Sequence, residues 1–323
     1  MNKEQFLDAF QTTLATHFTG TQNWWTKSLF HFTDITNAIS ILNHGKTYSR
    51  EKAIATGLMQ NDNANDEVIT LTSNEYKKYA RLYFGPSTPT QKNNEGIKPK
   101  ELISNNAHCP VPVMFIFDFK KVFLLNGTKF TDGNLATSPN ISDDIQDLNR
   151  LNFNLIYHRA WFNPEDRNTI INARHSEVLV KDELLLENNL RLIAVRSEAE
   201  KELLLYRLSD ELKEKYQNKI FVQPQTGIFT NDWIYVESVA IIEEQLVIKW
   251  HLCGNSTKCT NKYKLNIQII LFETNQIKKL EKLSWYPISS ITKFNLPEEY
   301  INVQFELKLY IDDIKVYNNM VGN

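Results

Sequence analysis

The stretch VPVMFIFDF, residues 111–119, decides the fold. Only Pro112 and Asp118 interrupt its apolar character, and the residues do not alternate between apolar and polar as they do in a half-buried strand. A short apolar run of this kind predicts a strand that is buried on both faces. We therefore expect a sizeable core to form around this segment.

Helices and further strands are predicted on both sides of this strand. Residues 4–16 carry apolar side chains at helical spacing. A second helix is expected to begin after Asp34, a favourable N-cap residue, and to end at Gly45. Further short strands are expected at three places: 153–157, 177–180 and 191–195.

The pattern changes after about residue 218. Ser197 and Glu200 form a capping box, which predicts a helix with one apolar stripe of Leu204, Leu205, Leu208, Leu212 and Tyr216. Beyond it, apolar and polar residues alternate at 265–271 and 303–311, as in half-buried strands. The sequence thus predicts an α+β fold of two domains: a mixed domain over 1–218 and a β-sandwich-like domain over 219–323.

Charge and cysteine content limit the possible functions. The 323 residues carry a net charge of −2, which disfavours a role in packaging nucleic acid and leaves room only for a local basic surface. Cys109, Cys253 and Cys259 are expected to be ordinary thiols, and no metal site is predicted. Because the start of the chain is polar and no apolar run reaches the roughly 18 to 20 residues of a membrane span, we expect a cytoplasmic protein.

Candidate catalytic residues lie in three short sequence motifs. HFTDITNAISILNHG (31–45) places His31 and Thr33 just before the second helix, and RLYFGPSTPTQKNNEG (81–96) places Tyr83 beside a proline turn. ARHSEVLV (173–180) places Glu177 at the start of a strand. Taken singly, a histidine beside aromatic residues is more often structural, and a glutamate at a strand edge is usually just solvated. The order of the three motifs along the chain is a more specific signal than any one of these residues alone.

In this order, the three motifs resemble those of the DarT family of nucleic-acid ADP-ribosyltransferases, over about residues 28–195. The resemblance implies an ADP-ribosyltransferase-like fold for the first domain, NAD as co-substrate and no metal. It makes Glu177 the catalytic carboxylate. The residues that it implies for the NAD pocket are His31, Phe32, Thr33, Arg50, Arg81 and Tyr83. In one respect the chain departs from the family, because Gly85 and Ser87 stand where its proline turn commonly carries a basic residue.

The implied chemistry suits a carboxylate. Cleavage of the bond between nicotinamide and ribose develops positive charge on the ribose, so a fixed negative charge stabilises the transition state more than the ground state. Glu177 can also orient the sugar through a hydroxyl and accept a proton from the attacking base.

The residues before Glu177 combine basic and aromatic side chains. His158, Arg159, Trp161 and Arg174 are the candidates for binding nucleic acid, since arginines suit phosphates and aromatic faces suit unstacked bases. A base whose ring atoms react must leave its stack, so a single strand of DNA or RNA is the expected substrate. The alternative interpretation makes Trp161 a core residue.

Two other functions are compatible with the sequence. A protein ADP-ribosyltransferase would share Glu177 and the NAD pocket but differ in the acceptor segment 157–176. A non-enzymatic binding module would work through the C-terminal sandwich. If the cell's own nucleic acid is the target, the resemblance implies a toxin of a toxin-antitoxin or anti-phage system, and an antitoxin protein as partner.

Overall fold

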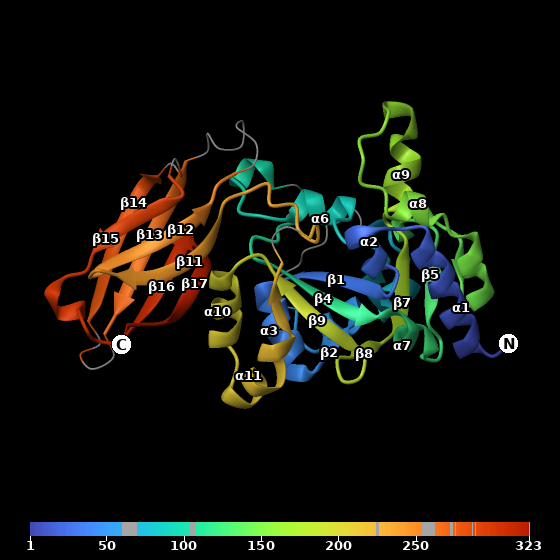
Figure 1. Ribbon diagram of the computed structural model, residues 1–323, viewed down its shortest axis with the longest axis horizontal. Helices are drawn as coiled ribbons and strands as arrows, with labels where there is room; N and C mark the ends of the chain where they lie inside the picture. Colours follow the sequence, from blue (N-terminus) through green and yellow to red (C-terminus); the bar gives the residue numbers. More distant parts are fainter. Residues whose placement is uncertain are drawn as a thin grey trace.

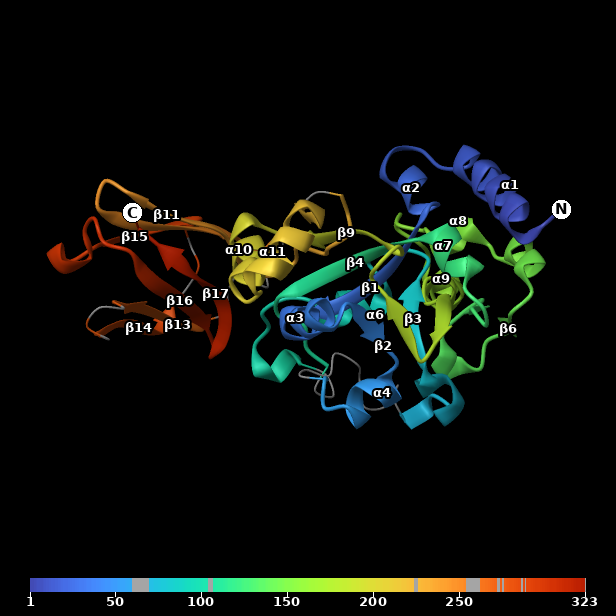
Figure 2. The ribbon, with the colours of Figure 1, turned by 90° about the horizontal axis from the view of Figure 1, so that it is seen from below.

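The structure is a computed structural model that describes residues 1–59, 70–103, 107–223, 226–253, 262–271, 274, 276–285, 287 and 289–322. The molecule is elongated, with a mixed α/β part at the N-terminal end and a β-sandwich at the C-terminal end (Figure 1). Between them lie α10 (Glu198–Tyr206) and α11 (Asp210–Tyr216), as the view from below also shows (Figure 2). The predicted α+β class, with a sandwich-like C-terminal region, is confirmed.

An eight-stranded sheet organises the mixed part, in the order β10-β9-β4-β1-β3-β7-β5-β6. Neighbouring strands are antiparallel except β9 and β10, which run parallel. The strands are β1 (Ser28–Asp34), β3 (Tyr79–Tyr83), β4 (Pro112–Asp118), β5 (Lys129–Thr131), β6 (Ile141–Ser142), β7 (Glu177–Lys181), β9 (Leu190–Val195) and β10 (Ile220–Val222). The predicted buried strand is β4, between β1 and β9. A separate pair joins β2 (Lys46–Tyr48) to β8 (Glu183–Leu185).

Short helices cover this sheet. The α-helices are α1 (Lys3–Thr16), α2 (Gly20–Trp25), α3 (Ile35–His44), α4 (Arg50–Ala55), α6 (Pro89–Asn94), α7 (Phe119–Leu124), α8 (Phe153–Ile156) and α9 (Arg167–Ala173). The 3-10 turns are η1 (Asn74–Lys78), η2 (Lys100–Leu102), η3 (Leu135–Thr137), η4 (Ile145–Arg150), η5 (Pro164–Asp166), η6 (Gln217–Lys219) and η7 (Glu298–Tyr300). The Asp34 side chain caps α3 by accepting from Thr36 N, and Gly45 ends it at a φ of 66°, so both predicted limits are confirmed.

Two sequence-based expectations about helices and strands were wrong. Residues 153–156 form the helical turn α8 rather than a strand, because the Asn152 side chain accepts from Leu155 N and starts a helix there. The long helix predicted after Ser197 is broken into α10 and α11, because Ser209 caps a second helix. Its apolar stripe nevertheless faces the core, where Leu204, Leu208 and Tyr216 are buried.

Aromatic rings fill the core under the sheet. Phe84 lies within 5.5 to 6.4 Å, centroid to centroid, of four other phenylalanine rings, those of Phe119, Phe123, Phe130 and Phe153. Burial of each such side chain contributes roughly 1.5 to 3 kcal/mol. This cluster fixes the position of the loop that leaves β3 immediately before Gly85.

The C-terminal region is a sandwich of two antiparallel sheets (Figure 2). One holds β11 (Tyr235–Ile242), β12 (Gln245–His251) and β15 (Ile291–Asn295); the other holds β14 (Ile277–Trp285), β13 (Tyr263–Ile270), β16 (Phe305–Ile311) and β17 (Ile314–Val321). The predicted alternation is confirmed in β13 and β16, where every second residue is buried. Trp250 and Trp285 meet between the sheets, with ring centroids 4.7 Å apart.

The strand β14 lies at the edge of its sheet. Lys282 pairs with Leu265 and Lys278 pairs with Ile269, so both lysines stand in register with buried residues of β13. The Lys282 ammonium lies 5.5 Å from the centroid of the Phe294 ring. The inner face of this edge strand is therefore charged.

Side-chain hydrogen bonds join α10 to the sandwich. The Tyr317 hydroxyl donates to Glu202 Oε2 at 2.6 Å, and the Tyr206 hydroxyl donates to Glu306 Oε1 at 3.2 Å. On the other side, a fully buried ion pair links Arg196 to Glu200, and the Arg196 guanidinium lies 4.4 Å from the centroid of the Tyr235 ring. The two parts thus share a well-packed junction.

The segment after β10 returns to the mixed part. The Ser87 hydroxyl donates to Gly227 O at 2.7 Å, Gln91 Nε2 donates to Ile228 O at 2.7 Å, and Thr230 N donates to Glu95 Oε1 at 2.9 Å. Residues 220–222 also belong to the eight-stranded sheet. The domain boundary after residue 218 stays a prediction, and these contacts tie 220–222 and 227–230 to the first unit.

Candidate active site

Glu177 is the first residue of β7 and lies directly opposite Tyr83, the last residue of β3. Its side chain is buried, and the residue is 2% exposed. Its backbone N–H donates to Thr131 Oγ1 at 2.9 Å, and the Thr131 hydroxyl in turn donates to Gly133 O at 2.7 Å. The glutamate that the sequence places at a strand start is therefore fixed in place rather than solvated.

The Glu177 carboxyl group is buried beside a cation. Arg81 Nε lies 3.6 Å from Oε2, and among the described residues Oε2 has no hydrogen-bond partner. Burial raises the pKa of Glu177, while the positive charge of Arg81 and the backbone N–H of Leu135 act in the opposite direction. An unsatisfied, buried carboxylate oxygen costs free energy, so its retention suggests that a ligand meets it.

His31 and Tyr83 complete the same cluster. His31 lies in the middle of β1, three residues before the helix cap, and its Nδ1 is 3.0 Å from Arg81 O. A carbonyl only accepts, so Nδ1 carries the proton, and burial lowers the pKa of His31. The neutral ring then presents Nε2 as an acceptor. Burial and the Glu177 charge raise the pKa of Tyr83, so its phenol stays neutral.

The remaining candidates for the NAD pocket are more dispersed. Phe32 and Thr33 follow His31 on β1, where Phe32 is half-buried and Thr33 is buried. Arg50 is the first residue of α4, which follows β2 in the sequence, and it is half-buried. The structure thus brings Arg81, Tyr83 and Glu177 together, and His31 contacts the backbone carbonyl of Arg81.

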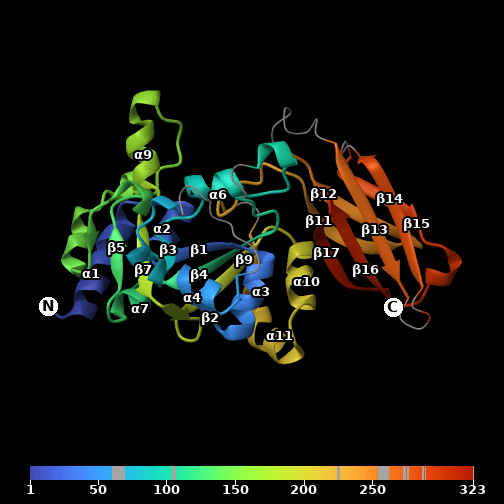
Figure 3. The same cartoon turned by 180° about the vertical axis from the view of Figure 1, so that it is seen from behind.

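The acceptor candidates lie around α8 and α9 (Figure 1), and α9 stands above β7 (Figure 3). Trp161 is 81% exposed, so the interpretation of this residue as part of the core was wrong. The His158 ring contacts Phe162 edge to face at 5.8 Å, and its buried Nδ1 has no hydrogen-bond partner among the described residues. A tryptophan held open to solvent suits stacking on an unpaired base.

Arg159 and Arg174 lie on either side of the proline turn. The guanidinium of Arg174, a residue 9% exposed, donates to Ser87 O. The Arg159 guanidinium lies 5.1 Å from the centroid of the Trp25 ring. Burial and the charge of Arg159 lower the pKa of Arg174. Ser87 links the two residues, because its hydroxyl donates to Gly227 O and Gly227 lies against the Arg159 guanidinium.

Several supporting residues were missed by the sequence analysis. His175 Nε2 is 3.0 Å from Thr90 Oγ1, and Nδ1 donates to Ile171 O at 2.8 Å, so His175 ties α6 to the segment before Glu177. Ser87 adopts a φ of 55°, with its N–H donating to Gln91 Oε1 at 2.9 Å. No periodicity or motif marks Thr131, Ser87 or His175, because their partners come from distant parts of the chain.

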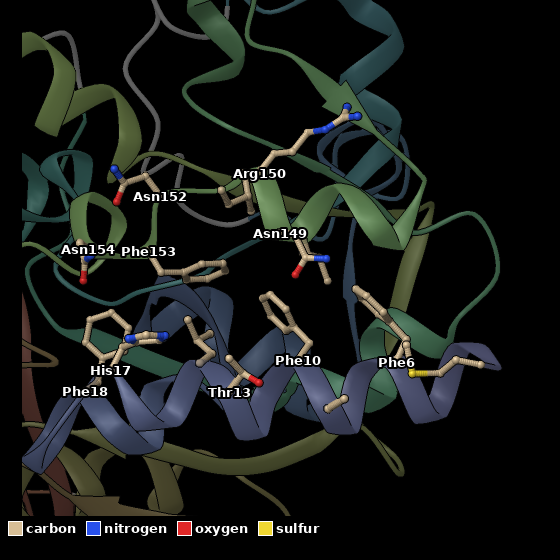
Figure 4. Close-up of a pocket in the computed structure, with 15 residues that line it drawn as sticks. Phe6, Phe10, Thr13, His17, Phe18, Asn149, Arg150, Asn152, Phe153 and Asn154 are labelled. Atoms are coloured by element: carbon tan, nitrogen blue, oxygen red, sulfur yellow. The ribbon is translucent and has the colours of Figure 1, made fainter.

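A separate cavity of about 580 Å³ opens between α1 and the segment 148–154 (Figure 4). Phe6, Phe10 and Phe153 line it, with Asn149 and Arg150 at its rim. None of the candidate NAD or acceptor residues lines it. We therefore place the chemistry at the strand ends rather than in this cavity.

The described residues form neither a metal-ligand cluster nor a membrane-spanning helix. Within the described ranges, no three His, Cys, Asp or Glu side chains are grouped closely enough to hold a metal ion. In the same part of the chain, no helix has both the length and the apolar character that crossing a membrane requires. Cys109 is free and buried, Cys253 is also buried, and Cys259 lies outside the described residues.

Comparison with known proteins identifies the family. The family profile described as "ssDNA thymidine ADP-ribosyltransferase, DarT" matches residues 30–234. The chain belongs to the DarT family. The expected class, an NAD-dependent ADP-ribosyltransferase, is thereby confirmed, and the non-enzymatic alternative is wrong. The DarT description names DNA, which resolves for the family the choice between DNA and RNA that the sequence left open.

Solved DarT structures are similar to this chain at low identity. The Thermus sp. 2.9 DarT in complex with ADP-ribosylated ssDNA is 16% identical, covering 62% of this chain and 95% of that one, with a TM-score of 0.49. The same protein in complex with NAD+ gives 15% identity, coverage of 62% and 96%, and a TM-score of 0.47. Thermosipho africanus DarTG in complex with ADP-ribose gives 17% identity, coverage of 68% and 54%, and a TM-score of 0.44. No curated protein matches the chain.

Proposed function

We propose that Glu177 is the catalytic carboxylate with which this chain transfers ADP-ribose from NAD to thymidine in single-stranded DNA. One observation carries the assignment: a buried carboxylate oxygen, next to Arg81, that no described residue satisfies. A fixed negative charge in a dry site is most effective where positive charge develops, as it does on the ribose when nicotinamide leaves. The same carboxylate then accepts the proton of the attacking base.

The neighbouring residues supply orientation. With its proton on Nδ1, His31 offers Nε2 to a hydroxyl donor, such as a ribose hydroxyl of NAD. Tyr83, neutral and opposite Glu177, offers an aromatic face at the same strand end. Arg81 and Arg50 are the candidates for the diphosphate, and Phe32 and Thr33 complete the proposed pocket.

The acceptor strand is proposed to lie against α8 and α9. Exposed Trp161 would stack on a base near the target, and His158, Arg159 and Arg174 would contact the strand. Arg174 is three residues from Glu177, so their Cα atoms are at most about 11 Å apart. A base bound beside Arg174 is therefore within reach of the ribose that Glu177 orients.

The biological setting is also a proposal. Modification of the cell's own DNA is harmful, so we propose a cytoplasmic toxin of a toxin-antitoxin or anti-phage system that an antitoxin protein neutralises. The free, buried thiol of Cys109 is compatible with a reducing compartment. The sandwich, within the proposed second domain 219–323, would serve recognition or regulation.

Labelled NAD provides the direct test. In separate reactions, the chain and labelled NAD are incubated with single-stranded DNA, with RNA of the same sequence, or with cell protein. The products of each reaction are analysed by mass spectrometry. We expect ADP-ribose on thymidine of the DNA. Label on protein alone would favour the protein ADP-ribosyltransferase, and label on RNA alone would overturn the choice of DNA.

A further inference from the structure

Three cationic side chains converge beside the proline turn, although their residues are far apart in the sequence. Arg174 donates to Ser87 O, and the Ser87 hydroxyl donates to Gly227 O. Gly227 in turn lies against Arg159, because a Cβ built on it would come within 1.8 Å of Arg159 Nη1. Lys92 lies on α6, whose Thr90 is joined to His175 next to Arg174. We call Lys92, Arg159 and Arg174 the cationic cluster.

The positive charge of this cluster is not neutralised within the described part of the chain. None of the three side chains forms an ion pair there, and Ser87 O is the one hydrogen-bond acceptor that Arg174 meets. Arg159 lies against the Trp25 ring and Gly227, neither of which carries a negative charge. A guanidinium has five N–H donors, so most donors of the two arginines remain available.

The charges are close enough to repel one another. Burial and then the charges of Arg174 and Arg159 lower the pKa of Lys92, and Asp232 acts in the opposite direction. Keeping like charges together costs free energy, and an anion that binds between them removes this cost. The arrangement is therefore suited to a bound anion.

Position identifies the anion. Ser87 follows Tyr83 by four residues and Arg174 precedes Glu177 by three, so the cluster lies at the same end of the sheet as the proposed catalytic carboxylate. Exposed Trp161 lies two residues from Arg159. A DNA strand with one base stacked on Trp161 carries a phosphodiester group at every nucleotide. Arginines bind such groups through paired N–H donors.

We propose that Lys92, Arg159 and Arg174 bind one backbone phosphate of the acceptor strand, and that Gly227 keeps the space in which the Arg159 guanidinium lies. The proposal rests on the proposed function and adds Lys92 and the segment after β10 to the acceptor site. Gly227 has a φ of 71°, which favours glycine, and an added methyl group would displace the flexible end of Arg159. The segment that leads to the sandwich thus forms one wall of the substrate site.

The salt dependence of DNA binding tests the proposal with Lys92→Met. The probe is a fluorescent single-stranded oligonucleotide with one thymidine, titrated without NAD. Each neutralised phosphate of a single strand contributes a slope of about 0.7 in log affinity against log salt. Between about 50 and about 500 mM salt the wild type should therefore lose about fivefold more affinity than Lys92→Met. Lys181→Met, an exposed lysine at the other end of β7, should retain the wild-type slope.

A second arm locates the phosphate. Oligonucleotides with a single neutral methylphosphonate at successive positions around the thymidine are compared for the wild type, Lys92→Met and Gly227→Ala. We expect one position at which neutralisation weakens wild-type binding about fivefold and both variants much less. If the wild type modifies the thymidine but Lys92→Met keeps its slope and all positions behave alike, the proposed phosphate contact is wrong. If the wild type modifies no DNA, the proposed function fails as well.

Discussion

Glu177→Gln separates a catalytic glutamate from a structural one. Glutamine has nearly the same shape but no charge. At a separation of about 4 Å and an effective dielectric of about 20, a carboxylate attracts a full positive charge by about 4 kcal/mol. Loss of this attraction from the ribosyl transition state lowers the rate by about 10³. We expect this loss in the transfer of ADP-ribose from labelled NAD to a thymidine-containing oligonucleotide, with NAD affinity retained.

The thermal stability of Glu177→Gln should rise, although its transfer activity falls. Burial raises the pKa of Glu177 in the folded protein, so this carboxyl group stabilises the fold below its unfolded pKa of about 4.3, and the contribution is lost as the pH rises through the folded pKa. Near neutral pH, where the group is ionised in the unfolded chain, burial of this carboxyl group therefore costs stability. We expect Glu177→Gln to melt at a higher temperature than the wild type at pH 7, with the difference shrinking as the pH falls toward about 4.3.

The matched control is Glu183→Gln. Glu183 lies on β8 and forms ion pairs with Lys46 of β2 at 3.1 Å and with Lys52 of α4 at 2.5 Å. This variant therefore removes a carboxylate outside the strand-end cluster. It should retain wild-type transfer. Wild-type-like transfer by Glu177→Gln itself, or a lower melting temperature with nearly intact turnover, would refute the catalytic assignment.

Other variants probe the rest of the site. His31→Ala should weaken NAD binding at an unchanged melting temperature, because it removes the Nε2 acceptor; unchanged affinity by calorimetry would exclude His31 from the pocket. Trp161→Ala should reduce transfer to an oligonucleotide more than slow NAD hydrolysis, whereas an equal loss of both would place Trp161 outside the acceptor site. A chain that ends at residue 234 should retain NAD binding in calorimetry, and we expect it to be more stable than one that ends at 218, which lacks β10 and the hydrogen bonds to Ser87, Gln91 and Glu95. Equal melting temperatures would show that these contacts add nothing to the first unit.

The sequence predicts local structure well where one pattern dominates. The apolar run of β4, the Asp34 and Gly45 limits of α3 and the alternation in β13 are all visible in short windows. Such windows fail where a side chain competes with the pattern. Asn152 turned an expected strand into α8, and Ser209 divided an expected helix.

The site was predictable only in part, for a related reason. The catalytic candidates occur in sequence motifs that resemble those of a family. The residues that hold these candidates in place do not stand out in any motif. Thr131 reaches Glu177 from 46 positions away and Ser87 reaches Gly227 from 140 positions away. Such contacts depend on the three-dimensional path of the chain, and one sequence alone contains no signal for them.

The lysines on the inner face of β14 also bear on the behaviour of the chain at high concentration. An outer strand exposes unpaired backbone groups that a strand from another molecule can join, and charges facing inward make such a joined sheet unfavourable. Lys278 and Lys282 would have to be buried between two sheets if a second molecule extended this one. Replacing both by valine should therefore make the protein prone to self-association, measurable by light scattering, while leaving the chemistry at the other end of the molecule unchanged.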